Sequence, residues 1–416
     1  MISQELKKID PALFELIELE VKRQRETIDL IPSECLAPLT VLEVLGSPLT
    51  NKYSEGQAGK RYYPGNAIYD QIEELAKQRA KEVFGLDDNW EANVQALSGG
   101  PANLAIYFGL LEPGDILMGM ELASGGHLSH GHKVNVSGKI FRPVQYGLGE
   151  DGRLDFNAIE KLAQDSKPKI IVSGFTAYPL IIDFEKFGAI AKKVGSWHMA
   201  DISHIAGLVA AGVHPSPFPF ADIVMATTHK TLNGPRGAII FSRKELSDKI
   251  NRGVFPSLQG GPHNNNIAAI ALCLEIAKTP QFKEIQKQII KNAAVLAESL
   301  RGFGFQLSAG GTENHLLLAD LSNKNISGME AQNVLEMAGI LANRNAVPGD
   351  ISPFNPSGLR MGTPSVSFRG MKEGEMGLIA NWIDRVVSQK EAPEAICQEV
   401  KALCQKFPLP YLGSES

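Results

Sequence analysis

Lys230 stands in a setting that favours chemistry. It follows the apolar run 223–228, has hydroxyl and imidazole neighbours at Thr227 and His229, and precedes a Gly-Pro-Arg-Gly turn over 234–237. A lysine amine held at the end of a buried strand can act as a nucleophile toward a carbonyl group. Taken alone, this position also fits an ordinary solvated loop lysine.

Two other apolar runs end in polar residues in the same way. Asp201 and His204 close the run that begins at residue 196, and Thr176 follows the run 169–174. Ligands of open α/β sheets bind beyond the carboxyl ends of the strands. We therefore expect an aspartate, two histidines and a lysine on one rim of a sheet.

Pyridoxal phosphate accounts for a lysine and an aspartate in such a place. The lysine amine forms a Schiff base with the aldehyde of this cofactor, and an aspartate keeps the pyridine nitrogen protonated. A buried carboxylate needs such a cationic partner. At about 4 Å and an effective dielectric near 20, the gross attraction is roughly 4 kcal/mol.

The phosphate of that cofactor would need a cradle of backbone N–H groups. Ser98, Gly99 and Gly100 precede the apolar helix expected over 104–111, and a helix N-terminus favours an anion. The pair Gly260-Gly261 is a second glycine site of this kind. A plain turn before a helix is the alternative for each.

An amino-acid substrate would need a partner for its carboxylate. Arg360 is the candidate, because a guanidinium binds a carboxylate through two parallel hydrogen bonds, although a surface arginine is the alternative. The run Gly-Leu-Gly-Glu-Asp-Gly at 147–152 has dinucleotide-motif spacing but precedes a polar turn, so we do not expect it to bind a nucleotide. We also expect no metal site among the histidines near 127–132 and 198–204, because residues i and i+3 of a strand point to opposite faces. A turn at the strand end could bring Asp201 and His204 together, but His198 would stay behind.

Composition narrows the class of protein. The 416 residues are 44% apolar and carry a net charge of −5, with no basic footprint for nucleic acid or an anionic membrane. No eighteen apolar residues run together, so no membrane span is expected. The N-terminal stretch lacks an apolar signal segment, and the four cysteines are sparse and unpatterned. These features predict a cytoplasmic protein.

Short β-rich runs alternate with helical stretches between about residues 90 and 245. This alternation predicts a three-layer α/β domain with a mainly parallel sheet. A helical stretch over 264–301, broken at Pro280, leads to a smaller C-terminal α+β domain. The expected division is an N-terminal helical arm (1–50), a large cofactor-binding domain (51–280) and a small domain (281–416). Other helices are expected at 11–26, 68–84, 155–165, 184–194, 328–338, 373–389 and 393–406.

Ten motifs, in order through about residues 27–385, together resemble the serine hydroxymethyltransferases, pyridoxal-phosphate enzymes of the aspartate-aminotransferase fold type. They are LIPSEC (30–35), TNKYSEG (50–56), GKRYY (59–63), SGGHLSHG (124–131), AGLVAAG (206–212), TTHKTL (227–232), GPRG (234–237), QGGP (259–262), GGTENH (310–315) and RMGTP (360–364). The resemblance implies reversible conversion of L-serine and tetrahydrofolate to glycine and 5,10-methylenetetrahydrofolate. It also implies a homo-oligomer, at least a dimer, whose subunits share active sites.

The resemblance also implies roles for individual residues. Lys230 would carry the cofactor, and Asp201 would bind its pyridine nitrogen. Catalysis would involve Lys230, Glu55, His229, Thr227 and Tyr63. The cofactor would further contact His127, His204, Thr176, Ser98, Gly99 and Gly100, with Tyr53, Gly260 and Gly261 from a neighbouring subunit. Substrate binding would involve Ser33, Arg360, Tyr63, Glu55 and His204, and folate binding Leu122, Gly126, Leu128, Asn345 and Glu55.

The sequence departs from the common family pattern in a few places. Pro32, Cys35 and Gly100 replace a small residue, an asparagine and a serine, and the loop after Asn345 is one residue short. These departures bear on folate affinity more than on cofactor chemistry. Two other functions fit the same motifs: a related aldolase that cleaves 3-hydroxy amino acids without folate, and a catalytically silent paralogue that serves as a scaffold.

Overall fold

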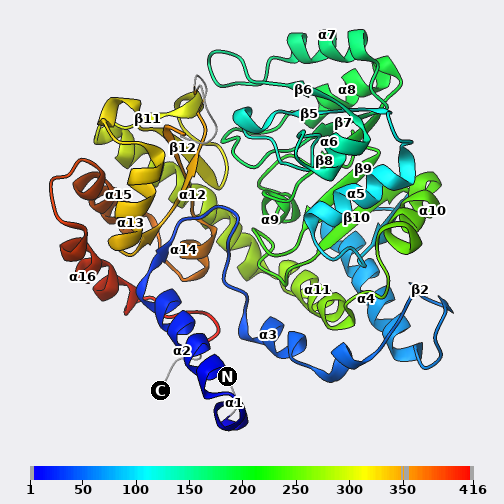
Figure 1. Cartoon of the computed structure of the whole chain (residues 1–416), viewed down its shortest axis with the longest axis horizontal. Coiled ribbons are helices and arrows are strands. Elements are labelled where there is room, and N and C mark those ends of the chain that lie inside the picture. Colours follow the sequence, from blue (N-terminus) through cyan, green and yellow to red (C-terminus); the bar gives the residue numbers. More distant parts are fainter. Residues whose placement is uncertain (1–3, 348–349, 351–355, 413–416) are drawn as a thin grey trace.

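The computed structural model describes residues 4–347, 350 and 356–412. Its larger part is built around a seven-stranded sheet in the order β4-β10-β9-β8-β7-β5-β6 (Figure 1). The strands from β9 to β6 are parallel, and β10 runs antiparallel to both of its neighbours. The bounds are β4 (Trp90–Asn93), β5 (Ile116–Met120), β6 (Arg142–Tyr146), β7 (Ile170–Ser173), β8 (Trp197–Asp201), β9 (Ile223–Thr227) and β10 (Ala238–Arg243).

Helices cover both faces of this sheet. Successive strand residues point to opposite faces, so Met199 of β8 packs into one core and Ala200 into the other. The helices of this part are α4 (Ala67–Phe84), α5 (Gly99–Leu110), α6 (Val136–Ile140), α7 (Phe156–Ser166), α8 (Phe184–Val194), α9 (Ala206–Ala210), α10 (Lys244–Arg252) and α11 (Asn264–Ala277). The predicted three-layer α/β architecture with a mainly parallel sheet is confirmed.

A second sheet lies at the other side of the molecule. It is antiparallel, in the order β11-β12-β15-β14, with bounds β11 (Gln306–Leu307), β12 (Leu316–Asp320), β14 (Asn343–Asn345) and β15 (Gly358–Gly362). This sheet packs in a second core with α12 (Pro280–Gly302), α13 (Gly328–Met337), α15 (Glu373–Val387) and α16 (Pro393–Cys404). The short helix α14 (Pro364–Phe368) follows β15. The predicted helix break falls at Pro280, which begins α12 behind the cap residue Thr279.

The N-terminal segment touches both parts of the chain. It contains α1 (Gln4–Ile9), α2 (Pro11–Glu26), β1 (Ile28–Asp29) and α3 (Leu39–Leu45), followed by the hairpin of β2 (Gly56–Gln57) and β3 (Lys60–Arg61). Strand β1 pairs with β13 (Ile340–Leu341) beside the second sheet, whereas α3 packs on α11. The division at residues 50 and 280 stays a prediction.

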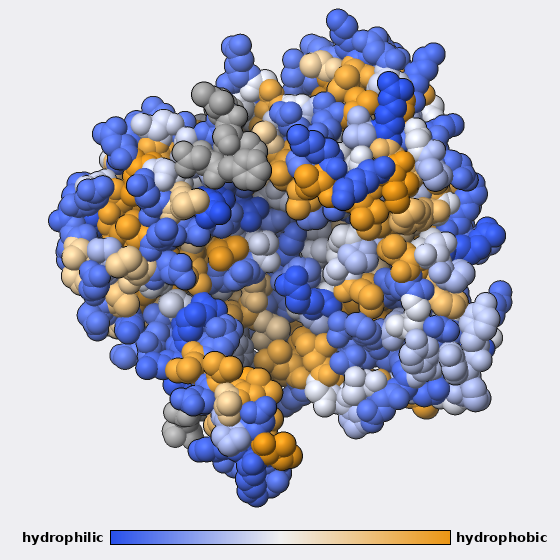
Figure 2. All heavy atoms as spheres, viewed as in Figure 1, coloured by the Kyte–Doolittle hydropathy of each residue, from blue (hydrophilic) through white to orange (hydrophobic). Residues whose placement is uncertain are grey.

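Helix α2 forms where the apolar spacing predicts it, but its apolar face is uncovered. Leu13, Leu16 and Leu19 are exposed, as is Ile9 before them. Figure 2 shows apolar side chains on the projecting arm where Figure 1 places α1 and α2. A stripe of this kind normally faces a core, so this helix presents a surface that a second chain can cover.

Within the described ranges, no helix is both long and apolar enough to cross a membrane.

Candidate active site

A cavity of about 560 Å³ lies beyond the carboxyl ends of β7, β8 and β9. This is the rim at which the sequence predicts a ligand site. Fifteen of the predicted residues line the cavity: Ser33, Ser98, Gly99, Gly100, Leu122, Gly126, His127, Leu128, Thr176, Asp201, His204, Thr227, His229, Lys230 and Arg360. Arg236 lines it too.

Lys230 is held in the turn that follows β9. The backbone N–H of Gly234 donates to the carbonyl of Thr228 at 2.7 Å, and Asn233 takes a left-handed conformation with φ of 59°. The lysine is only 9% exposed, and its side chain donates no hydrogen bond to any residue that the structure describes. Burial lowers the pKa of Lys230 to about 8, against the opposing attraction of Asp201. The amine therefore deprotonates far more easily than that of an exposed lysine.

Asp201 ends β8 and is kept ionised by three donors. Asn103 Nδ2 at 3.0 Å and His130 Nε2 at 2.9 Å donate to its Oδ2, and the backbone N–H of Ser203 donates to Oδ1 at 3.1 Å. Burial alone would raise the pKa of this carboxyl, but the hydrogen bonds outweigh it and hold the pKa well below its usual range. The site therefore presents a fixed negative charge opposite Lys230.

His127 is neutral and held by Ser129. The backbone N–H of Ser129 donates to His127 Nδ1 at 3.2 Å, so Nδ1 is an acceptor and the Ser129 hydroxyl, at 2.7 Å, donates to it as well. Burial, followed by the nearby His130, lowers the pKa of His127 to about 4. A neutral aromatic ring of this kind can stack on a flat ligand.

Helix α5 begins at Gly99 with Ser98 as its N-cap, five residues before the start that the sequence predicts. Both glycines belong to the first turn of the helix, which also contains Pro101, a residue suited to that turn. A Cβ at Gly99 would lie 2.7 Å from Cγ2 of Thr227, so a larger residue would close the space against β9. No such obstacle exists at Gly100. The free N–H groups of this turn form a cradle for an anion.

Arg360 reaches the cavity from β15 of the second sheet. Its Nη1 donates to the carbonyl of Thr176 at 2.6 Å, and its Nε donates to Asn343 Oδ1 at 3.1 Å. Burial lowers the pKa of Arg360 to about 10, which leaves the guanidinium charged at neutral pH. The side chain thus carries a positive charge from one part of the chain into the cavity of the other.

His204 makes a second contact between the two parts. Its Nδ1 lies 3.2 Å from Nε2 of His315, and both rings are buried. Burial lowers the pKa of His315 to about 3 and that of His204 well below its usual range, so both rings are neutral at physiological pH. Burial also lowers the pKa of His229, beside Lys230, to about 4.

Six predicted residues do not line this cavity. A Cβ at Gly260 would lie 3.1 Å from Oε1 of Glu55, and one at Gly261 would lie 3.1 Å from the ring of Tyr53. Tyr53 and Tyr63 are exposed and make an edge contact with ring centroids 5.1 Å apart. These five residues (Tyr53, Glu55, Tyr63, Gly260 and Gly261) form one group elsewhere on the chain, hereafter the outward group.

Asn345, the sixth residue, lines a small neighbouring cavity with Gly125 and Ala177, and its side chain donates to the carbonyl of Ala346 at 2.8 Å. The predicted shortening of the loop after Asn345 concerns residues that lie partly outside the described ranges, at 348–349 and 351–355.

Sequence reasoning missed the residues that support the predicted ones. His130, Asn103 and Ser203 hold Asp201, and His315 supports His204. One signal was available, because His130 belongs to the motif at 124–131.

His198 does not line the cavity. Its ring contacts the Ser173 hydroxyl and the carbonyl of Phe220. Within the described ranges, no group of three or more His, Cys, Asp or Glu residues could hold a metal ion.

Comparison with known proteins adds a family to this geometry. The family model described as "Serine hydroxymethyltransferase" matches residues 6–383. The chain is 52% identical over 411 residues to a serine hydroxymethyltransferase of Desulfotalea psychrophila, which covers 98% of this chain and 96% of the relative. It is 51% identical over 414 residues to a serine hydroxymethyltransferase of Acidothermus cellulolyticus, with coverage of 97% and 96%.

Proposed function

The chain belongs to the serine hydroxymethyltransferase family, and from this premise we propose how its residues divide the reaction between them. The enzyme is a pyridoxal-phosphate-dependent transferase that interconverts L-serine and tetrahydrofolate with glycine and 5,10-methylenetetrahydrofolate. The observation that carries the assignment of residues is the buried amine of Lys230 beside the ionised Asp201, with Arg360 in the same cavity.

The cavity residues fit pyridoxal phosphate. Lys230 would bind its aldehyde, Asp201 its pyridine nitrogen, and His127 the face of its ring, while Thr176 and His204 would contact its phenolic oxygen. Its phosphate would lie at Ser98, Gly99 and Gly100, where a Cβ on Gly99 would fill the cradle. When bound, this cofactor supplies an electron-withdrawing ring that accepts the electrons released at the substrate α carbon.

Arg360 and Ser33 would bind the carboxylate of the amino acid. Nε and Nη1 of Arg360 are used by Asn343 and Thr176, and these two bonds fix the plane of the guanidinium. Its Nη2 donates to no other residue within the described ranges, so it is free for a substrate. A carboxylate held at this point has a fixed orientation, which lowers the entropy lost in the reaction.

His229 and Thr227 lie beside Lys230 and would assist proton movement at its amine. The low pKa of His229, caused by burial, keeps its ring neutral at physiological pH. The Thr227 hydroxyl donates to the carbonyl of Ser203 at 3.3 Å, which links β9 to the end of β8. This contact keeps the lysine turn and the aspartate in register.

The outward group would act in a second subunit. Glu55 would be the acid or base near the substrate hydroxyl and the folate, and Tyr63 would assist it. Tyr53, Gly260 and Gly261 would reach the neighbouring phosphate. Exposure of Tyr53 and Tyr63, and the uncovered apolar face of α2, support a homo-oligomer of at least two chains. Each cavity would then be completed by the partner.

Tetrahydrofolate would bind at the mouth of the cavity. Leu122, Gly126 and Leu128 line it there, and Leu128 is partly exposed and can cover a flat ring. A Cβ at Gly126 would lie 2.0 Å from the carbonyl of Met120, so the close approach of these two backbones requires glycine. Asn345 would contribute from the adjoining small cavity, and Glu55 from the partner subunit.

The arm 1–50, the large domain 51–280 and the small domain 281–416 would be the units of the chain. The chain contains a mainly parallel sheet and an antiparallel sheet, and each has its own core. These separate cores support the division between the domains. A cytoplasmic location is supported by the four free cysteines, two of which are buried.

The assignment is tested with purified enzyme carrying its cofactor. Lys230→Ala should lose the visible absorbance of the attached cofactor and all serine turnover, and turnover at the wild-type rate would contradict the role of Lys230. Serine cleavage by the wild type should require tetrahydrofolate. Equal cleavage without it would favour the folate-independent aldolase, and a chain with no visible absorbance would favour the silent paralogue.

A further inference from the structure

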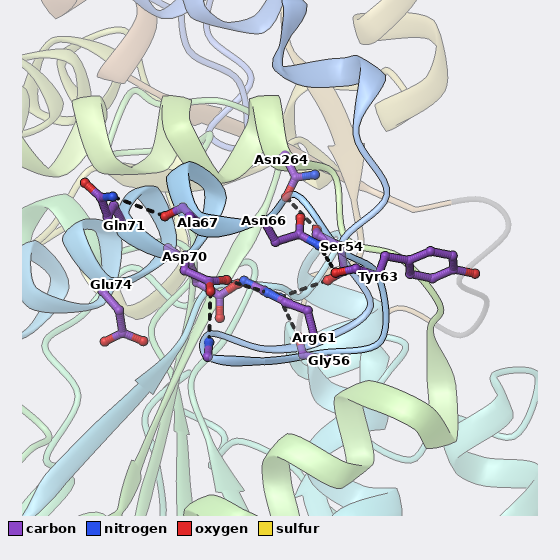
Figure 3. A network of polar contacts seen from close by, with 12 residues as sticks. Ser54, Gly56, Arg61, Tyr63, Asn66, Ala67, Asp70, Gln71, Glu74 and Asn264 are labelled. Carbon is purple, nitrogen blue, oxygen red and sulfur yellow. Dashed lines mark hydrogen bonds and ion pairs between the residues drawn. The ribbon is translucent and has the colours of Figure 1, made fainter.

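A buried ion cluster connects the segment 53–63, which contains Tyr53, Glu55 and Tyr63, to α4 (Figure 3). Arg61, whose side chain is 4% exposed, is its centre. Its Nε donates to Asp70 at 2.8 Å and its Nη2 donates to the buried Glu73 at 2.7 Å, both on α4. These two carboxylates hold the guanidinium in one orientation.

The remaining arm of Arg61 binds backbone on either side of residue 55. Its Nη1 donates to the carbonyl of Ser54 at 2.9 Å and also to the carbonyl of Gly56. Gln95 Nε2 donates to the same Gly56 carbonyl at 3.0 Å. One guanidinium thus connects two backbone oxygens of the segment to two carboxylates of α4.

The backbone of Glu55 itself is fixed as well. The N–H of Tyr62 donates to its carbonyl at 3.0 Å, so three consecutive carbonyls, at 54, 55 and 56, all have donors. Gly56 has φ of 98°, and a Cβ there would lie 2.4 Å from the carbonyl of Lys60. The backbone at residue 55 is therefore set, and the Glu55 side chain is what remains free to act.

The same frame includes the glycine pair of the outward group. Ser54 Oγ donates to Asn264 Oδ1 at 2.7 Å, and Asn264 Nδ2 donates to the carbonyl of Lys52 at 2.8 Å. Asn264 begins α11, three residues after Gly261. Figure 3 shows Asn264 and Ser54 above the cluster, with Tyr63 pointing away from it.

We propose that Arg61 is a positioning residue for the reaction in the partner subunit: it fixes the backbone at 54–56 so that Glu55 enters the partner's cavity in one place. Arg61 does not line the cavity of its own chain. This inference rests on the proposed sharing of active sites between subunits. Lysine cannot replace Arg61, because a single ammonium cannot bridge two carboxylates and two carbonyls in fixed directions.

Arg61→Ala and Arg61→Lys should each lower kcat for serine and tetrahydrofolate by about 100-fold, the scale expected when a catalytic group is displaced by about 1 Å. The visible absorbance of the cofactor on Lys230 should remain. Arg385→Ala is the matched control, because Arg385 also bonds two carboxylates, Glu391 and Glu399, but lies in the small domain away from the cavity. Its kcat should equal that of the wild type.

Hybrid dimers separate positioning in the partner from a role within the same chain. In a hybrid of an Arg61→Ala chain and a Lys230→Ala chain, one cavity combines an intact Lys230 with an intact outward group. The Arg61→Ala and Lys230→Ala homodimers should both be nearly inactive. If Arg61 acts on the partner's site, one of the two cavities in the hybrid is complete, so the hybrid should have about half the wild-type activity. The parallel hybrid of Glu55→Gln and Lys230→Ala tests the shared site itself.

Each outcome decides one of the two statements. Recovery in both hybrids supports the role of Arg61. Recovery with Glu55→Gln but not with Arg61→Ala overturns that role and leaves the shared site intact, whereas recovery in neither overturns the shared site. Arg61→Lys replaces Arg61→Ala if the latter does not fold, and failure of both variants to fold would mean that the cluster maintains the fold, which also overturns the proposal.

Discussion

Lys230 should destabilise the enzyme when the cofactor is absent, so that Lys230→Met makes the cofactor-free protein more stable at neutral pH. The amine is nearly buried, donates no hydrogen bond to a described residue, and has its pKa lowered by burial. Methionine has a similar length and no charge. Asp201 would keep its bonds to His130, Asn103 and Ser203, so the substitution leaves no unsatisfied carboxylate.

The size of the effect follows from the two pKa values of Lys230. An unfolded chain releases the lysine proton near the ordinary lysine pKa of 10.5, and the folded chain releases it at a pKa of about 8. At 1.36 kcal/mol for each pH unit of difference, the charged amine destabilises the fold by about 3 kcal/mol. Between pH 8 and 10.5 the unfolded state binds more protons, so wild-type stability rises with pH in that window. The full destabilisation is present below pH 8.

Thermal unfolding of the two cofactor-free proteins measures this difference. With an unfolding entropy of about 2.1 cal/mol/K per residue, 3 kcal/mol raises the midpoint of a 416-residue chain by about 3–4 °C. Lys230→Met should show this gain at pH 7 and lose most of it by pH 10. Lys287→Met, at an exposed lysine paired with Glu284, is the control and should show no such change. Equal midpoints at pH 7, or a difference that stays constant above pH 8, would refute the reasoning.

Three further substitutions have expected outcomes. Arg369→Met removes a buried guanidinium that donates to backbone carbonyls at the ends of α2 and α16, and should destabilise the enzyme by about 3 kcal/mol in urea unfolding without changing serine kinetics. His130→Ala removes a donor to Asp201, so the pKa of that carboxyl should rise and cofactor affinity should fall about tenfold in a binding titration. Arg360→Lys loses the planar fork and should raise the KM for serine about tenfold or more in steady-state kinetics, with a smaller change in kcat.

The sheet and its rim could be predicted because the pattern is local. Each apolar run that ends in a polar residue is one buried strand followed by one loop, and the strand order places those loops together. This is why Lys230, Asp201 and Thr176 converge as expected. The start of α5 at Gly99 was harder to predict, because glycine is a poor helix former.

The partners of His130, Asn103 and His315 could not be predicted, because packing rather than spacing brings these residues to Asp201 and His204. Asp201 is 71 positions from His130 and 98 from Asn103, and nothing in either segment specifies the pairing. The contact of His204 with His315 joins two parts of the chain whose relative position the sequence does not encode locally. Each of these residues is polar and buried, which requires a partner but does not say which one.

The two halves of the proposed site are built in opposite ways, and this favours catalysis by assembly. Lys230, Asp201 and Arg360 are buried in their own chain. Burial sets the pKa values of Lys230 and Arg360, and hydrogen bonds within the chain set that of Asp201, before any partner arrives. Tyr53 and Tyr63 are exposed, while the backbone beside them is fixed by Arg61 and its carboxylates. When a second chain covers such side chains, they lose rotamer freedom, but the backbone that carries them is already ordered and adds no further cost to binding. In the proposed assembly, each chain would therefore prepare the cofactor chemistry alone and deliver its acid or base to another copy of itself.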